Sequence, residues 1–123
     1  MDNQVDERAL QVRQALYFCT GTENYYTNQH ISYEYTDGVK IFCEKAGAYW
    51  LLDLVESVIK TKPELNNDLI GITLTVKEGN KARIAFRKRV RLIYYQHIPF
   101  TDCPRGKWKF YYQGKVLFWN MEY

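Results

Sequence analysis

Long apolar runs are missing from this chain, and with them the simplest way of crossing a membrane. A spanning helix needs about 20 consecutive, mostly apolar residues, and no stretch of the sequence approaches that length. The first residues, MDNQVDERALQ, are polar and acidic, which is not the pattern of a signal peptide. We therefore expect a cytoplasmic protein with no membrane partner.

Cysteine and histidine are scarce as well. Cys19, Cys43 and Cys103 are far apart, odd in number and without a C-x-x-C pair, which argues against a disulfide framework and favours free thiols. The two histidines, His30 and His97, do not form a ligand pair with the spacing of a structural zinc site. We expect no metal and no other cofactor.

Motifs that carry catalysis are also lacking. The sequence contains no phosphate-binding loop, no dinucleotide-binding glycine fingerprint and no nucleophile elbow. A thiol nucleophile needs a histidine beside it, and along the chain only His97 and Cys103 are close. Cys43 falls in an apolar helical stripe, where a core role explains it. These absences favour a protein that is not an enzyme.

What the chain does contain is aromatic side chains and an uneven distribution of charge. It has 123 residues, of which 16% are aromatic and 11 are tyrosines, and this fits a single domain spanning residues 1–123. Residues 1–68 hold eleven acids and six bases, whereas residues 69–123 hold three acids and eleven bases. Such a split predicts one acidic and one basic side, and favours either self-association, as in a homodimer, or a charged partner.

Helical periodicity dominates the acidic half, residues 1–68. The first segment has one apolar stripe, formed by Val5, Ala9, Val12, Leu16 and Cys19. Two further helices are predicted between Thr36 and Pro63, with an interruption at Gly47. The first of them turns Val39, Phe42 and Ala46 inward. The second has a buried stripe of Leu51, Leu54, Val55, Val58 and Ile59.

From Leu69 onward the apolar period changes to two, which indicates half-buried strands. KEGNK (77–81) has the composition of a hairpin turn, and Gln113-Gly114 joins a last pair of strands. The sequence therefore predicts an α+β domain. Its N-terminal helices pack on one face of an antiparallel β-meander of four or five strands, which makes up the basic half, residues 69–123.

The stretch KARIAFRKRVRLIYYQ (81–96) has six cations within its first eleven residues. Strand alternation favours one outer-face patch, formed by Arg83, Arg87, Arg89, Arg91 and Tyr95. Tyr111 and Trp119 are expected on the same face. Cations with interleaved aromatic rings are what a single nucleic-acid strand needs, for its phosphates and its bases. The simpler interpretation is a solvated face whose cations protect an edge strand from aggregation.

Four tyrosines crowd the polar stretch TENYYTNQHISYEY (22–35), which has no helical period. They are Tyr25, Tyr26, Tyr33 and Tyr35. ISYEY alternates and predicts a short strand or an extended arm. Because tyrosine and arginine carry much of the energy of protein interfaces, we interpret this segment as an irregular aromatic surface for a partner.

Three segments, FCTGTENYY (18–26), YTDGVKIFCEKAGAYWLLD (35–53) and IPFTDCP (98–104), give the chain a likeness to known proteins. In order and spacing they resemble a family of small bacterial proteins classed as a domain of unknown function. The resemblance implies company on plasmids and phages, where proteins of this size are often binding proteins that block a host defence enzyme, anti-CRISPR inhibitors among them.

These observations leave two functions open. The first hypothesis is a non-enzymatic protein-binding module, an inhibitor of a host defence complex that handles nucleic acid, carried by a mobile element. It would use the tyrosine segment and the basic strip. The alternative is a single-stranded nucleic-acid-binding protein that uses the basic and aromatic sheet face.

Overall fold

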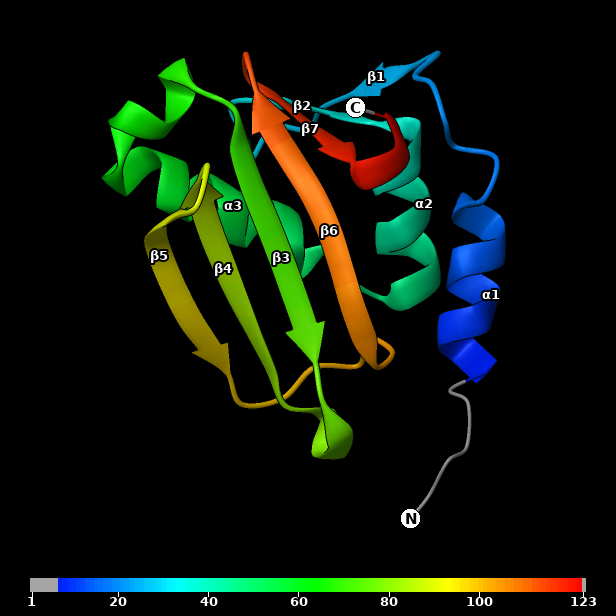
Figure 1. The fold of residues 1–123 in the computed structure, drawn as a ribbon. Helices are drawn as coiled ribbons and strands as arrows, with labels where there is room; N and C mark the ends of the chain where they lie inside the picture. Colours follow the sequence, from blue (N-terminus) through cyan, green and yellow to red (C-terminus); the bar gives the residue numbers. More distant parts are fainter. Residues whose placement is uncertain (1–6, 123) are drawn as a thin grey trace.

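Three helices and one mixed sheet of seven strands make up the computed structural model, which describes residues 7–122 apart from the side chains of Glu64 and Asn66 (Figure 1). The helices are α1 (Glu7–Leu16), α2 (Asp37–Ala46) and α3 (Trp50–Thr61). The predicted α+β class is confirmed. The predicted sheet has fewer strands than the observed one and lacks its parallel pair.

The helices follow the apolar stripes closely. Ala9, Val12 and Leu16 of α1 are buried, as is Cys19 beyond its end, whereas Val5 lies outside the described residues. In α2, Val39, Phe42 and Ala46 point into the core. The helix ends at Gly47, which adopts φ +65°, a left-handed conformation that glycine enters without steric cost.

Helix α3 is rotated slightly from the predicted stripe. Leu51, Val55 and Val58 are buried, but Leu54 is only half-buried. Leu52 and Glu56 take buried positions instead. The apolar stripe of α3 is wider than the surface that the core covers, so the residues along one side of the stripe remain partly exposed. Leu54 is on that side.

Five strands form the antiparallel part of the sheet: β3 (Ile70–Val76), β4 (Ala82–Lys88), β5 (Arg91–Ile98), β6 (Gly106–Gln113) and β7 (Val116–Trp119). They do not form a meander. β6 crosses back after β5 and pairs with β3, so the spatial order is β7-β6-β3-β4-β5. This is the Greek-key arrangement, which the long connection from Pro99 to Arg105 permits.

Two short strands from the acidic half extend the sheet beyond β7. β2 (Glu34–Thr36) pairs parallel with β7, and β1 (Tyr25–Tyr26) pairs antiparallel with β2. The sheet is therefore mixed, which corrects the predicted all-antiparallel sheet. Two- and three-residue strands have no period long enough to read from sequence.

A carboxylate fastens this end of the sheet to α2. Glu122 accepts hydrogen bonds from the Thr36 hydroxyl (2.6 Å), the Gly38 N–H (3.0 Å) and the Trp119 N–H (2.8 Å). At Gly38, an added Cβ would lie 2.6 Å from Glu122 Oε1. Only glycine permits this approach, which places an anion at the positive end of α2.

The core lies between the helices and the inner face of the sheet. Its largest fully buried side chains include Trp108, Phe42 and Phe110. Their rings meet at centroid distances of 5.2 Å (Phe42–Trp108) and 5.0 Å (Phe42–Phe110). The Trp108 indole N–H donates to the Pro104 carbonyl at 3.0 Å, so its one polar group is satisfied.

Candidate functional site

The sheet has one face that no helix covers in the described part of the chain. In Figure 1, α3 lies behind β3 and β4, and no helix crosses in front of these strands. Alternation divides each strand between the two faces. On β3, Ile72 and Leu74 are buried, while Thr73 and Thr75 are half-buried on the opposite side. We call the side opposite the helices the outer face.

Four cations stand on the outer face. Arg83 and Arg87 come from β4, and Lys107 and Lys109 come from β6. The register places Thr75 between Arg83 and Lys107, so these two cations are about 10 Å apart across two strand spacings. No ion pair joins any of the four to an acid within the described residues.

Small side chains line the middle of the outer face and aromatic rings stand at its sides. Thr73 has Ala85 and Lys109 as its cross-strand neighbours. On β5, Tyr95 and His97 meet edge to face at 5.0 Å between ring centroids. On the other side, Tyr111 and Phe118 lie 6.0 Å apart in a tilted arrangement. The outcome is a shallow floor between two groups of rings.

The outward positions of β3 to β7 hold no acidic residue. They are Gly71, Thr73, Thr75, Arg83, Ala85, Arg87, Leu92, Tyr95, His97, Lys107, Lys109, Tyr111, Gln113, Val116 and Phe118. Opposite charges usually alternate on a solvated sheet because cross-strand ion pairs stabilise it. On these five strands the cations stand without acids, which gives this part of the face a positive potential that attracts an anionic ligand.

Arg89 and Arg91 do not belong to this face, which corrects the predicted basic patch. Arg89 lies with Val90 in the two-residue turn between β4 and β5, where its φ is +58°. Arg91 pairs with Lys88, which follows Arg87 and so points to the opposite side of β4. The prediction put Arg89 and Arg91 on one face of the next strand, but Arg89 lies in the turn that precedes that strand.

The predicted tyrosine surface is also largely absent. Tyr33 and Tyr35 are buried, 2% and 7% exposed, so neither presents its ring to a partner. Tyr26 is half-buried, and its hydroxyl donates to Asp37 Oδ1 at 2.8 Å. Only Tyr25 is exposed. Pairing of β1 with β2, and of β2 with β7, turns the other rings toward the helices.

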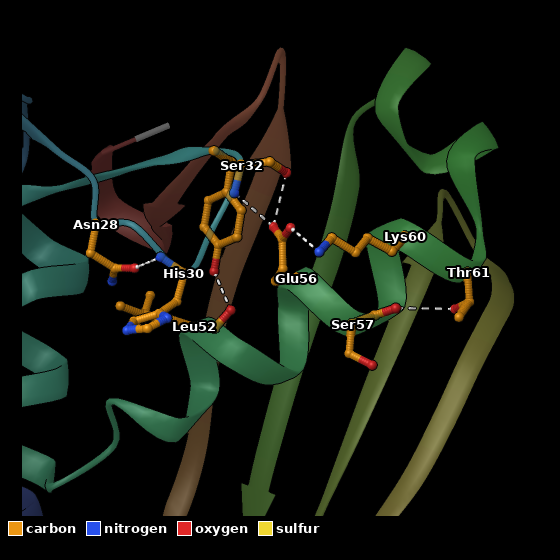
Figure 2. A network of polar contacts seen from close by, with 9 residues as sticks. Asn28, His30, Ser32, Leu52, Glu56, Ser57, Lys60 and Thr61 are labelled. Atoms are coloured by element: carbon orange, nitrogen blue, oxygen red, sulfur yellow. Dashed lines mark hydrogen bonds and ion pairs between the residues drawn. The ribbon is translucent and has the colours of Figure 1, made fainter.

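Glu56 explains why this segment is ordered without being helical (Figure 2). Its Oε1 accepts hydrogen bonds from the Ser32 N–H and hydroxyl, both at 2.9 Å, and its Oε2 lies 3.4 Å from Lys60 Nζ. Nearby, the Tyr33 hydroxyl donates to the Leu52 carbonyl at 2.7 Å. Burial alone would raise the pKa of Glu56, but these partners outweigh it and hold that pKa below its ordinary value.

The three thiols lie in the interior of the protein. Cys19, Cys43 and Cys103 are all buried. Burial raises the pKa of Cys43 to about 12, so this thiol stays protonated at neutral pH. Among residues 7–122, no three metal-ligating side chains gather in one place. None of the helices in that range is both long and apolar enough to reach across a bilayer.

A cavity of about 720 Å³ adjoins the outer face at the edge of β6. Lys107 and Lys109 belong to both surfaces. The remaining walls come from α1 with the residues that follow it, and from the chain after β7. They are Arg13, Leu16, Tyr17, Phe18, Thr20, Trp119, Asn120 and Met121.

Part of this site is visible in the sequence and part is not. Arg83, Arg87, Tyr95 and Tyr111 lie on the outer face as predicted. Trp119 does not, because it is buried on the helix side next to Phe110. The two lysines of β6 were missed, although their alternation with Trp108 in KWKF is the pattern of a strand with one wet face.

Comparison with known proteins gives a family but no activity. A family model with the description "Family of unknown function (DUF6876)" matches residues 10–123. No curated protein and no solved structure matches the chain.

Proposed function

We propose that this chain, which belongs to DUF6876, a family of unknown function, is a non-enzymatic protein that binds single-stranded nucleic acid on the outer face of its sheet. One observation carries the proposal. Arg83, Arg87, Lys107 and Lys109 stand together on an uncovered face whose outward positions from β3 to β7 hold no acid. The acid Glu34 pairs with Val116 from β2, beyond these strands.

Phosphates explain the cations. A nucleic-acid strand carries a regular row of negative charges, and neutralising them releases bound counterions, which supplies most of the sequence-independent affinity. Arginine and lysine that are free of ion pairs make such contacts without breaking existing ones. Arg83 and Lys107 stand on either side of Thr75, and Lys109 stands beside Thr73. The positive charges are therefore distributed across neighbouring strands.

Bases explain the aromatic rings. An unpaired base gains about 1–3 kcal/mol by stacking on an aromatic side chain, and this gain depends little on sequence. Tyr95 is 39% exposed and stands across from Ala85, so its ring is accessible above a small neighbour. Tyr111 leans over Gly71, where a Cβ would lie 3.8 Å from its Cε1.

The shape of the surface favours a single strand over a duplex. The four cations and Tyr95 lie on four neighbouring strands, from β6 to β5, whose outermost axes are about 14 Å apart at the usual strand spacing. The major groove of B-DNA is about 12 Å wide and admits a helix or a two-stranded ribbon. A surface of four β-strands is too wide to enter this groove, whereas a flexible single strand of nucleic acid can lie along it.

The test is fluorescence anisotropy with a labelled oligothymidylate of about twelve nucleotides, a length that spans a typical single-strand site. If all four cations contact phosphates, the logarithm of the affinity falls with the logarithm of salt concentration with a slope of about −2.8. Replacing Arg83 and Arg87 by serine should flatten the slope to about −1.4 and weaken binding at low salt.

A matched control separates the face from net charge. Arg89→Ser with Arg91→Ser removes the same charge from positions off the outer face, and this variant should keep most of the salt slope. Equal losses in the two double variants would reduce the effect to overall charge. No binding by the wild-type protein at low salt would overturn the proposal.

A second candidate keeps the surface and changes the partner. A protein with an acidic patch would be steered to the same cations, and the exposed pair Tyr17 and Phe18, 73% and 85% accessible, adds apolar area beside them. In this form the protein is an inhibitor of a host defence complex, as the resemblance to mobile-element proteins implies. Nuclease-treated host lysate distinguishes the two. A protein retained by the wild type but not by the Arg83/Arg87 variant supports the inhibitor, and loss of retention on nuclease treatment supports nucleic acid.

A further inference from the structure

The cavity at the edge of β6 exists because β7 is short. The last pair between these strands is Phe110 with Trp119. From Gly106 to Lys109, β6 is hydrogen-bonded to β3 on one side only. On the other side stands α1, from which Arg13 Nη2 donates to the Lys107 carbonyl at 3.1 Å. The space that a longer β7 would fill is therefore left open.

One wall of this cavity contains an unsatisfied donor. Trp119 is 6% exposed, and its indole Nε1 has no hydrogen-bond acceptor within the described part of the chain. A buried N–H without an acceptor costs roughly 1–3 kcal/mol. Trp108, close by, shows the ordinary arrangement, with its own indole N–H bonded to a carbonyl. Because the Trp119 Nε1 atom is itself covered, the cavity meets this residue through the rest of its ring.

The other walls define what the ligand has to be. Leu16, Phe18, Trp119 and Met121 supply apolar surface suited to a flat body. The cations of the cavity are Arg13, Lys107 and Lys109, and among residues 7–122 no acidic side chain lines it. Arg13 is held in place over the Trp108 ring, 4.1 Å from its centroid. Neither lysine forms an ion pair with a described acid, so both can meet an anion.

We propose that this cavity binds one nucleotide, with its base between the apolar walls, the Trp119 ring among them, and its phosphate on Lys107 and Lys109. The volume of about 720 Å³ lies within the range of pockets for small ligands. The inference rests on the proposed function, since the same two lysines end the strand-binding face. The nucleotide has two sources, the end of a bound strand or a free mononucleotide.

The experiment follows the indole N–H resonances by NMR during titration with adenosine and uridine monophosphates. The resonance of Trp119, assigned by its loss in Trp119→Phe, should shift with saturation, while that of Trp50 on α3, which does not line the cavity, stays in place. A 5′-phosphorylated oligothymidylate forms the second arm. A shift with the oligonucleotide alone identifies the strand end as the source. An unmoved Trp119 resonance in both arms overturns the proposal.

A cavity-filling variant gives an independent readout. Thr20→Tyr places a ring in the cavity from an exposed position and should lower mononucleotide affinity at least tenfold. Gln11→Tyr adds the same ring to α1 at an exposed position outside the cavity, and should leave affinity unchanged. Equal affinities in the two variants contradict the site.

The two proposals fail separately. Arg83→Ser with Arg87→Ser removes cations that do not line the cavity, so mononucleotide binding should survive this change. Mononucleotide binding without oligonucleotide binding would retain the cavity and reject the strand-binding face. Oligonucleotide binding with no response at Trp119 would retain the face and reject the cavity.

Discussion

Glu56 shows how a single buried acid positions a segment that has almost no secondary structure of its own. The residues between β1 and β2 have no helix to hold them, and Glu56 reaches them from α3 through Ser32. Both of its hydrogen bonds to Ser32 favour the charged carboxylate, as does Lys60 one turn further along the helix. A buried charge with this many partners is stabilising only while it remains charged.

Replacing Glu56 by glutamine should lower the free energy of unfolding by about 1–3 kcal/mol at pH 7, because charge-assisted bonds become neutral ones. The folded pKa of Glu56 is lowered from 4.5, so its contribution is complete above that value and is lost as pH falls through the folded pKa. The difference between wild type and variant should therefore shrink toward pH 3. Urea denaturation at both pH values measures it.

Glu23→Gln is the control, since Glu23 is exposed and its replacement should change stability by less than about 0.5 kcal/mol. A Glu56→Gln penalty that stays constant from pH 7 to pH 3 would show that the carboxylate charge is not what stabilises the segment.

At the scale of elements, the β4–β5 hairpin shows that an alternating pattern predicts strands but does not locate the turn between them. Cations alternate from Lys81 onward, and this pattern alone continues through Arg89. The chain instead reverses at Arg89 and Val90, and a β-bulge near Phe86 and Arg87 shifts the register. A turn without glycine, asparagine or proline gives no signal in the sequence, so two of the four arginines were assigned to the wrong surface.

Arg89→Gly should stabilise the protein by up to about 1 kcal/mol, because a left-handed conformation costs a residue with a Cβ about 1–2 kcal/mol and the added backbone entropy of glycine offsets part of that gain. Val90→Gly, at a position without positive φ, should destabilise instead. Thermal unfolding of the two variants gives the comparison. A loss of stability in Arg89→Gly would mean that the arginine side chain itself supports the turn.

The difference between local and long-range patterns explains how far the fold and the site could be predicted from the sequence. Periods of 3.6 and 2 are local, and they identified all three helices and the five long strands. The pairing of β6 with β3, and of β2 with β7, joins residues far apart in the chain and leaves no local pattern. Tyr33 and Tyr35 alternate with polar neighbours in ISYEY, and the burial that this alternation indicates was available in the sequence.

At the scale of the whole molecule, the sheet has one strong and one weak end. β3 pairs with β6 at seven register positions and with β4 at six, whereas β2 pairs with β7 at two and with β1 at two. The outer face lies on the strong end, and the tyrosines lie on the weak one. A binding surface on long, mutually paired strands is well preorganised for a ligand.

Native-state hydrogen exchange should reveal this division. Amides of β3 should exchange only through global unfolding, while amides of β2, such as that of Tyr35, should exchange through a local opening of lower free energy. The dependence of both rates on low concentrations of denaturant distinguishes the two routes. Equal exchange free energies for Tyr35 and Leu74 would show that the sheet opens as one unit.

The parallel pairing of β2 with β7 also has a consequence for biosynthesis. The ribosome makes Val116 about eighty residues after its partner Glu34, which at about 5–20 residues per second is a delay of some 4–16 seconds. During that time β2 has no strand to join, and Tyr33 and Tyr35, which the mature fold buries, remain available to chaperones or to other nascent chains. The helices are synthesised first, but the end of the sheet that they cover is finished last.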